Sequence, residues 1–426
     1  MFPPEIWEKI LGYTEAASLI RLKTVCCMWN EIITKHLQES NAWYRQCKND
    51  IPEKYWLMLL ENSLHSTTLL RHEKSNSDKK PNYKIWLTMY RAWIKWCNVQ
   101  NFNMHTFDEF KPIPDHRPSE RITCCTVLGE LAAVGSTEGY IRIYNLRTNQ
   151  LVFRVDQYEQ VKDVKLCVQG KKHDKIVLIA TSICNKSRVW DITSQRSLLL
   201  RSGDVICAGY GYYCTTLYND TIIVYDATTE DCYPTRLFIQ DLNNRKLSST
   251  KYVNMIINRN ELCFLTDNGL YCQLDLKDIS QLSTFLYTPD VKSIGVPKNQ
   301  KVRQYYLFNP CVAFCVTDRG HLGISVYKTK WQMYNTFPFL EGSVTAILFH
   351  VRILVIGLDS GDVCLFYVEN ESALRTINFK SKKSKRIHVA SEPIVSVNIM
   401  EILGDQRLLV ATKSTIYHIK LHSVAN

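Results

Sequence analysis

Residues 131–145 read LAAVGSTEGYIRIYN, and this stretch contains a complete signal for a β-hairpin. An apolar run, Leu131–Ser136, ends in small residues and is followed by the polar turn Thr137-Glu138-Gly139. Apolar and polar residues then alternate from Tyr140 to Asn145. A tight turn between paired strands needs a residue that tolerates positive φ, and glycine supplies it. The stretch therefore predicts two antiparallel strands joined by a short turn.

The same pattern returns six times toward the C-terminus. The later copies occupy residues 176–191, 219–226, 262–275, 311–327, 353–367 and 408–419. Six intervals of about 46 residues separate the turn at Gly139 from the turn at Ser414, and this period is typical of a four-stranded propeller blade. The repeat predicts an all-β propeller over residues 99–426, with seven blades. Eight blades, or six with a distorted insertion around residues 276–304, are the alternatives.

The seventh copy provides three strands and lacks a fourth. The extended stretch Val99–Phe107 stands just before the first copy and has no other partner. We therefore expect residues 99–107 to pair with the C-terminal blade as its outer strand. This pairing would close the ring and cover an edge that could otherwise pair with another chain.

At the N-terminus, helical spacing replaces strand alternation. Residues 1–30 read MFPPEIWEKILGYTEAASLIRLKTVCCMWN. Proline is tolerated in the first turn of a helix, so Pro3 and Pro4 fit a helix start. The first helix is predicted to carry an apolar stripe made of Ile6, Ile10 and Leu11, and to end at Gly12. A second helix, with Ser18 as its N-cap, is predicted to carry Leu19, Leu22, Val25, Cys26 and Trp29.

Residues 48–98 are predicted to form a helical connector. Apolar residues at helical spacing begin at Trp56, and a polar segment near 73–82 indicates an exposed loop. A second helix carries Trp86, Tyr90, Trp93 and Trp96 at helical spacing. Such an aromatic stripe usually packs inside a protein. We expect it to brace the N-terminal helices against the propeller.

Composition limits the classes of function. The chain has 426 residues, 46% of them apolar, and a formal net charge of +11. Because a Pro-rich turn and an amphipathic helix follow Met1, no signal peptide is expected, and no apolar run is long enough to span a membrane. Sixteen cysteines lie mostly in strand-like runs, where a small apolar group fits, so a reducing compartment, cytoplasmic or nuclear, is expected. No P-loop, nucleophile elbow, zinc-protease motif or zinc-ligand spacing is present, so the sequence predicts no enzyme, no cofactor and no metal site.

The N-terminal pattern resembles an F-box, the short helical module that docks a protein onto the adaptor of a cullin–RING ubiquitin ligase. The resemblance rests on Pro-Pro-Glu-Ile from Pro3, on the later pairs Ile-Leu and Val-Cys, and on Trp29 and Trp43. With the repeat, which contains one literal Trp190-Asp191, the chain is similar to the F-box/WD-repeat protein family. The resemblance places the F-box at residues 1–47.

The resemblance also implies which residues face the adaptor. They would be Pro3, Pro4, Ile6, Ile10, Leu11, Leu19, Leu22, Val25 and Cys26, on or just under one apolar face. Two positions depart from the family pattern. Thr14 stands where leucine is usual, and Cys27 stands where a basic residue is usual. Trp29 and Trp43 are expected to pack internally.

Two basic features could meet a substrate. Arg142 and Arg188 hold the same position in adjacent repeats, where related receptors carry phosphate-binding arginines, and guanidinium groups bind phosphate through paired hydrogen bonds. Structural arginines are also common at this position. The second feature is the basic run Lys380–Arg386, interpreted as a nuclear-import signal, an acid-binding loop or, more simply, a solvated loop.

The resemblance implies a substrate-recognition subunit of an SCF-type ubiquitin ligase. Its partners would be the adaptor, through it a cullin and a RING protein, and a protein substrate, which could be phosphorylated. The alternative is a propeller scaffold whose F-box no longer engages the ligase, because of Thr14 and Cys27. Nucleic-acid binding is not favoured, because the basic residues are dispersed and no RNA-stacking motif is present.

Overall fold

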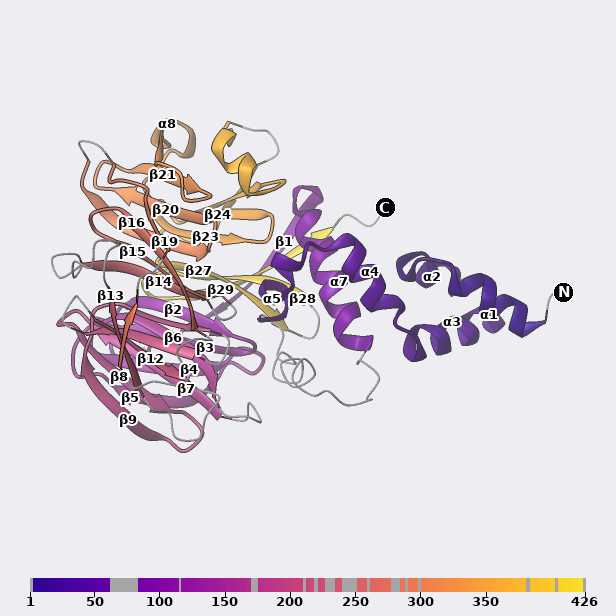
Figure 1. The fold of residues 1–426 in the computed structure, drawn as a ribbon, viewed down its shortest axis with the longest axis horizontal. Helices are drawn as coiled ribbons and strands as arrows, with labels where there is room; N and C mark the ends of the chain where they lie inside the picture. Colours follow the sequence, from indigo (N-terminus) through magenta and orange to yellow (C-terminus); the bar gives the residue numbers. More distant parts are fainter. Residues whose placement is uncertain are drawn as a thin grey trace.

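The computed structural model is a ring of β-sheets with a set of helices on one side of it (Figure 1). It describes residues 3–61, 83–114, 116–169, 175–209, 212–217, 221–226, 234–239, 251–258, 261–276, 284–287, 290–297, 300–380, 384–402 and 405–423. The loop expected near 73–82 lies outside these residues. Seven sheets make the ring, so the prediction of a seven-bladed propeller is confirmed and the alternatives of six and eight blades are wrong.

Each of the first three blades takes its four main strands in sequence order, from the inside of the ring outward. The first blade consists of β2 Ile122–Leu128, β3 Leu131–Ser136, β4 Tyr140–Asn145 and β5 Gln150–Asp156. The second consists of β6 Val161–Gln169, β7 Lys175–Ser182, β8 Lys186–Asp191 and β9 Arg196–Ser202. The third consists of β10 Ile206–Gly209, β11 Tyr212–Leu217, β12 Thr221–Asp226 and β13 Pro234–Ile239.

The remaining four blades follow the same antiparallel plan. The fourth blade consists of β14 Tyr252–Asn258, β15 Glu261–Thr266, β16 Leu270–Asp275 and β18 Asp290–Ser293, and the fifth of β19 Val302–Asn309, β20 Val312–Thr317, β21 His321–Val326 and β22 Gln332–Asn335. The sixth consists of β23 Val344–His350, β24 Ile353–Leu358, β25 Asp362–Tyr367 and β26 Lys385–His388. The seventh consists of β27 Ser396–Ile402, β28 Asp405–Ala411, β29 Ile416–Ser423 and β1 Phe102–Phe110.

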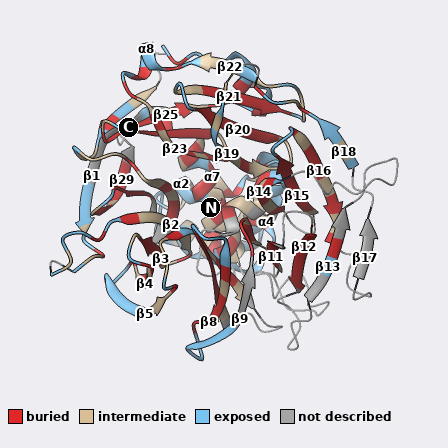
Figure 2. Cartoon of the chain, turned by 90° about the vertical axis from the view of Figure 1, so that its left-hand side faces the viewer, coloured by how far each residue is buried: buried red, intermediate tan, exposed pale blue. Residues whose placement is uncertain are grey.

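The innermost strands contact one another around the ring, from β2 through β6, β10, β14, β19 and β23 to β27 and back to β2. Because blades stack face to face, the second strand of a blade is covered on both sides. Every residue of β20 and of β24 is buried, which explains the uninterrupted apolar run Ile353–Leu358. Figure 2 shows this burial along the middle of the blades, with exposure increasing at the rim.

The predicted turn glycines do adopt positive φ. Gly139 has φ +88° and Gly361 has φ +82°, each in the turn between the second and third strands of its blade. At Gly361 a Cβ atom would lie 1.8 Å from the carbonyl oxygen of Ala390, so the backbone of the next connection also requires the missing side chain.

The predicted closure of the ring is confirmed. β1 pairs antiparallel with β29, with Phe107 opposite Ile419 and Phe110 opposite Ile416. The expected bounds are shifted, because Val99–Asn101 forms a short 3-10 helix, η1, and the strand begins at Phe102. Beyond the strand, Pro112 accepts a hydrogen bond from the Tyr144 hydroxyl at 2.5 Å, which ties the closing strand to the first blade.

The segment around residues 276–304, where the six-blade alternative placed a distorted insertion, contributes strands to two blades. β17, Thr284–Tyr287, leaves the fourth blade and pairs parallel with β13 at the rim of the third blade. The chain then returns as β18 to complete the fourth blade. The insertion thus adds a strand to a neighbouring blade and does not change the number of blades.

The helices on one side of the ring are α1 Pro4–Gly12, α2 Ala16–Leu22, α3 Cys27–Glu39, α4 Ala42–Asp50, α5 Glu53–Glu61 and α7 Tyr83–Cys97. Two short helical turns, α8 Phe337–Leu340 and η3 Glu371–Thr376, belong to the propeller. The end predicted for the first helix, Gly12, is confirmed. The N-cap predicted at Ser18 is wrong, because α2 begins at Ala16. The chain also turns after Leu22, so Cys26 caps a separate helix, α3.

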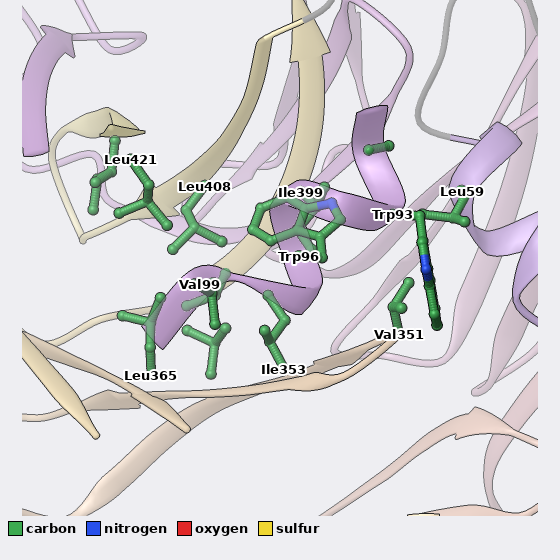
Figure 3. Close-up of a cluster of buried hydrophobic side chains, with 14 of the residues drawn as sticks. Leu59, Trp93, Trp96, Val99, Val351, Ile353, Leu365, Ile399, Leu408 and Leu421 are labelled. Carbon is green, nitrogen blue, oxygen red and sulfur yellow. The ribbon is translucent and has the colours of Figure 1, made fainter. Parts of the chain in front are cut away.

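The aromatic stripe of α7 packs internally, as expected, and it faces two different cores. Trp86 and Tyr90 pack with Trp43 in the core of the first helices and also contact the core that α7 shares with the propeller. Trp93 and Trp96, one and two turns later, pack with Ile353 and other apolar residues of the last two blades. Figure 3 shows Trp96 and Val99 between Ile353 and Leu365 on one side and Leu408 and Leu421 on the other. One helix therefore belongs to both cores.

Candidate functional site

Helices α1, α2 and α3 form the end of the molecule farthest from the propeller (Figure 1), and several apolar side chains there are exposed. Ile6 and Ile10 on α1 are 39% and 45% exposed, and Val25 after α2 is 61% exposed. Pro3 and Cys26 are also exposed, and Pro4 is the first residue of α1. Single exposed apolar residues are ordinary, but five of them between residues 6 and 25 make this end of the chain a candidate binding surface. We call Ile6, Ile10, Tyr13, Ile20 and Val25 the distal apolar surface.

The other predicted adaptor-facing residues lie beneath this surface. Leu11 and Leu19 are 1% and 0% exposed and pack with Ile33, while Leu22 is half-buried in the same cluster. These leucines therefore hold α1 and α2 against α3, and the side chains left for a partner are those of the exposed set. The structure thus divides eight of the nine predicted residues, all except Pro4, into a supporting group and a group accessible to solvent.

Two members of the distal apolar surface were not predicted. Tyr13 is 94% exposed and Ile20 is 37% exposed. Tyr13 directly follows Gly12, where α1 ends, so its side chain is outside the helical repeat that guided the prediction. Ile20 sits one residue after the buried Leu19, and that offset turns it about 100° around the helix axis, away from the buried face. An outward position for Ile20 was available from the spacing.

Aromatic contacts fix the helices that present this surface. Trp7 of α1 packs on Trp29 of α3, with ring centroids 4.9 Å apart. Trp43 is 2% exposed and Trp29 is half-buried, which confirms that both pack internally. Thr14, one of the two departures from the family pattern, donates its hydroxyl to the Ile10 carbonyl at 3.5 Å, and Cys27, the other, is exposed at the start of α3.

On the propeller, Arg142 already has a carboxylate partner. It is 3% exposed, and its two terminal nitrogens donate to the two oxygens of Glu120 at 2.6 and 2.9 Å. Burial raises the pKa of Glu120, but hydrogen bonds from Arg142 and Ser136 and the positive charge of Arg142 outweigh it, so the pKa lies below its ordinary value. A phosphate at Arg142 would have to compete with Glu120.

Arg188 occupies the equivalent position, as predicted: each arginine is the third residue of the third strand in its blade. The Arg188 guanidinium lies 4.7 Å from the ring centroid of Tyr158, which is 74% exposed, and donates to the Asp156 carbonyl at 3.4 Å. Its Nε is buried without a hydrogen-bond partner among the described residues. The role of both arginines in substrate binding remains a prediction.

The basic run Lys380–Arg386 is only partly described. Residues 381–383 lie outside the described part of the chain, and the run ends inside β26. Arg386 donates to Asp362 at 2.6 Å and to Glu341 at 3.2 Å, so its charge is compensated within the propeller. Lys385 and Arg386 belong to β26, so the loop interpretation is wrong for these two residues, although the Arg386 side chain stays exposed to solvent.

Among the residues that the structure describes, no helix is both long and apolar enough to cross a membrane. Within the same residues, no group of three or more histidine, cysteine, aspartate or glutamate side chains could hold a metal ion.

Comparison with known proteins bears on the helical end. A model of the F-box domain matches residues 1–38, which include α1, α2 and most of α3. Curated protein sequences give no match. Among solved structures, that of the computationally designed Ika8 protein covers 71% of this chain and 97% of its own, with 10% identity and a TM-score of 0.43. So low a likeness carries no argument, and the WD-repeat character of the blades remains a prediction.

Proposed function

We propose that this chain is the substrate-recognition subunit of an SCF-type E3 ubiquitin ligase, without catalytic residues of its own. The observation that carries the proposal is the coincidence of the F-box match at residues 1–38 with the distal apolar surface. F-box domains generally bind Skp1-type adaptors, and an exposed set of apolar side chains on a well-packed helical support fits that use. Through the adaptor, the cullin and RING protein would join the complex.

The substrate would bind to the side of the propeller that the helices leave free. β24 begins at Ile353, next to α7, so the turn at Gly361 lies at the opposite end of that strand. The corresponding turns of the other blades line the same face, and Arg142 and Arg188 approach it. A protein substrate, phosphorylated or not, is the proposed ligand of this face. Such a complex would work in the cytoplasm or nucleus.

A substitution at one exposed residue tests the proposal. Ile10→Asp places a charge in the distal apolar surface and should weaken adaptor binding at least ~30-fold, equivalent to about 2 kcal/mol, because a central apolar contact is replaced by an unpaired charge. Isothermal titration of the purified chain with a Skp1-type adaptor measures the change. Ile183→Asp is the matched control, since Ile183 is 55% exposed on the propeller, and it should leave affinity unchanged.

Leu19→Asp would be a poor test, because Leu19 is fully buried and the variant should unfold the first helices. If the wild-type chain does not bind the adaptor while the propeller still retains other proteins, the scaffold alternative is correct. Equal affinity of the Ile10→Asp and Ile183→Asp variants would place the adaptor elsewhere on the molecule.

A further inference from the structure

The central channel of the propeller contains a cavity of about 300 Å³ at its helix-facing end. Its wall comes from the innermost strands of five blades, β2, β14, β19, β23 and β27, and helix α5 contributes Tyr55 and Met58. This volume is at the lower end of the range found for small-molecule sites in proteins. The cavity lies away from the distal apolar surface and from the free face of the propeller.

The wall is mainly apolar and uncharged. Phe308 and Phe349 contribute aromatic rings, and Val127, Ile257 and Ile399 contribute aliphatic groups. The two charged residues of the lining are already paired, because Lys54 donates to Glu371 at 2.5 Å. A charged guest would lose its hydration without gaining a free counter-charge, whereas an aromatic guest could pack on the rings.

Two of the three asparagines in the wall give it a directional polar pattern. Asn309 accepts a hydrogen bond from the Cys311 backbone N–H at 2.8 Å, which assigns its oxygen and leaves its amide N–H₂ as a donor. Asn398 donates to the Cys125 carbonyl at 3.2 Å, which leaves its side-chain oxygen as an acceptor. Among the described residues, the hydrogen bonds of these two side chains use the Asn309 oxygen and the Asn398 amide nitrogen only.

We propose that this cavity binds a small, uncharged, aromatic molecule that accepts a hydrogen bond from Asn309 and donates one to Asn398. A lactam has this chemistry, because its carbonyl oxygen and its N–H are adjacent on one ring. Such a guest would lie between α5 and the inner strands, where the helices meet the propeller. The inference does not depend on adaptor binding.

The experiment uses the full chain and three bicyclic probes of similar size: 2-quinolone, 1-methyl-2-quinolone and naphthalene. Ligand-observed NMR titration gives the dissociation constant of each. 2-Quinolone should bind at least 10-fold more tightly than 1-methyl-2-quinolone, which lacks the N–H, and than naphthalene, which lacks both polar groups. Absence of 2-quinolone binding, or equal affinity for the three probes, would overturn the proposal and leave the cavity to water.

A matched pair of variants locates the site. Asn309→Asp keeps an oxygen for the Cys311 N–H but removes the free donor, and it should weaken 2-quinolone binding at least 10-fold. Asn378→Asp makes the same change at an exposed residue whose oxygen accepts from the Lys380 N–H at 2.9 Å. It should leave affinity unchanged. Identical affinities for the two variants would show that 2-quinolone binds outside the cavity.

Discussion

At the scale of single residues, Glu371 connects the helices to the propeller. It is 2% exposed, begins η3 after the third strand of the sixth blade, and accepts hydrogen bonds from Lys54, from the Tyr55 hydroxyl at 3.1 Å and from the Tyr327 hydroxyl at 3.5 Å. Burial, the negative charge of Glu371 and its hydrogen bond together raise the pKa of Tyr55 well above its ordinary value. Tyr55 therefore stays a hydroxyl donor at any physiological pH.

Glu371→Gln should lower the free energy of unfolding by about 1–3 kcal/mol, because the amide leaves Lys54 without its partner and supplies a donor where two hydroxyls need an acceptor. Lys54 is half exposed, so water recovers part of the loss. Urea unfolding followed by tryptophan fluorescence measures the difference. Glu369→Gln, a change at an exposed neighbour, should alter stability by less than about 0.5 kcal/mol; a similar loss there would contradict the role given to Glu371.

His350 makes stability depend on pH. It is 6% exposed and packs edge-on to Trp96, and burial lowers its pKa from 6.5 to about 3. Above pH 6.5 the folded and unfolded states are both neutral there. Between pH 6.5 and about 3 only the unfolded state binds the proton, so stability falls as pH falls.

His350→Phe should therefore flatten the pH dependence. Each pH unit below 6.5 costs the wild-type chain up to about 1.4 kcal/mol through this residue, and the variant should not show that loss. Urea unfolding at pH 7 and pH 5 gives the comparison. An equal loss in both proteins between these two values would show that other groups control the acid sensitivity.

For the two arginines of the propeller, the sequence predicted their positions better than their partners. Arg142 and Arg188 were placed correctly because the strand repeat fixes register. The pairing of Arg142 with Glu120 could not be predicted, because Glu120 lies in the irregular segment before β2, where the sequence has no periodic pattern. In the same way, the burial of Leu11 and Leu19 and the exposure of Ile10 required the angle between α1, α2 and α3.

At the scale of elements, local signals were sufficient where turn chemistry was strong. Glycine in the turn between the second and third strands marked four hairpins, and Gly139, Gly269, Gly320 and Gly361 all have positive φ. β17 was not predicted, because it is four residues long and pairs parallel with β13 across a wide gap in sequence. Parallel strands are joined by a long connection, so no short turn in the sequence marks their pairing.

Alanine substitutions at two turn glycines distinguish the cost of backbone strain from the cost of a steric clash. Gly320→Ala should cost about 1–2 kcal/mol, the price of a side chain at φ +74°, because a Cβ there meets nothing within 4 Å. Gly361→Ala should cost at least about 3 kcal/mol, because its Cβ would also displace the Ala390 carbonyl. Thermal unfolding of the two variants gives both values. Equal costs would mean that the connection at Ala390 moves freely.

At the scale of the whole molecule, the helices and the propeller share a continuous apolar core. Trp96 is 1% exposed and belongs, with Val99, to a cluster that includes Val355 and Leu365 of the sixth blade and Leu408 of the seventh. The sequence predicted that the aromatic residues of α7 brace the two parts. It could not show that the same helix contributes aromatic residues to two cores, because helical spacing does not determine which elements the stripe contacts.

Trp96→Ala should destabilise the chain by about 3–5 kcal/mol, since it leaves a large cavity between α7 and the last two blades. It should also loosen the helices from the propeller. Hydrogen exchange of α7 and the radius of gyration from small-angle scattering measure these effects. Ile94→Ala, on the same helix at 40% exposure, should change neither; unaltered exchange in Trp96→Ala would contradict the shared core.

The pairing of β1 with β29 has a consequence for how this protein is made. Arg407 and Asp108, which form an ion pair across this blade, are 299 residues apart in the sequence. At about 5–20 residues per second, a ribosome needs roughly 15–60 s to deliver the partner of β1 after β1 itself has emerged. For most of that interval, until the sixth blade at residues 344–388 has been made, the indoles of Trp93 and Trp96 have no blade to cover them. Nascent chains are therefore expected to bind chaperones that hold apolar segments. A chain truncated before residue 416 would lack β29, so it would keep its F-box helices but could not close the ring.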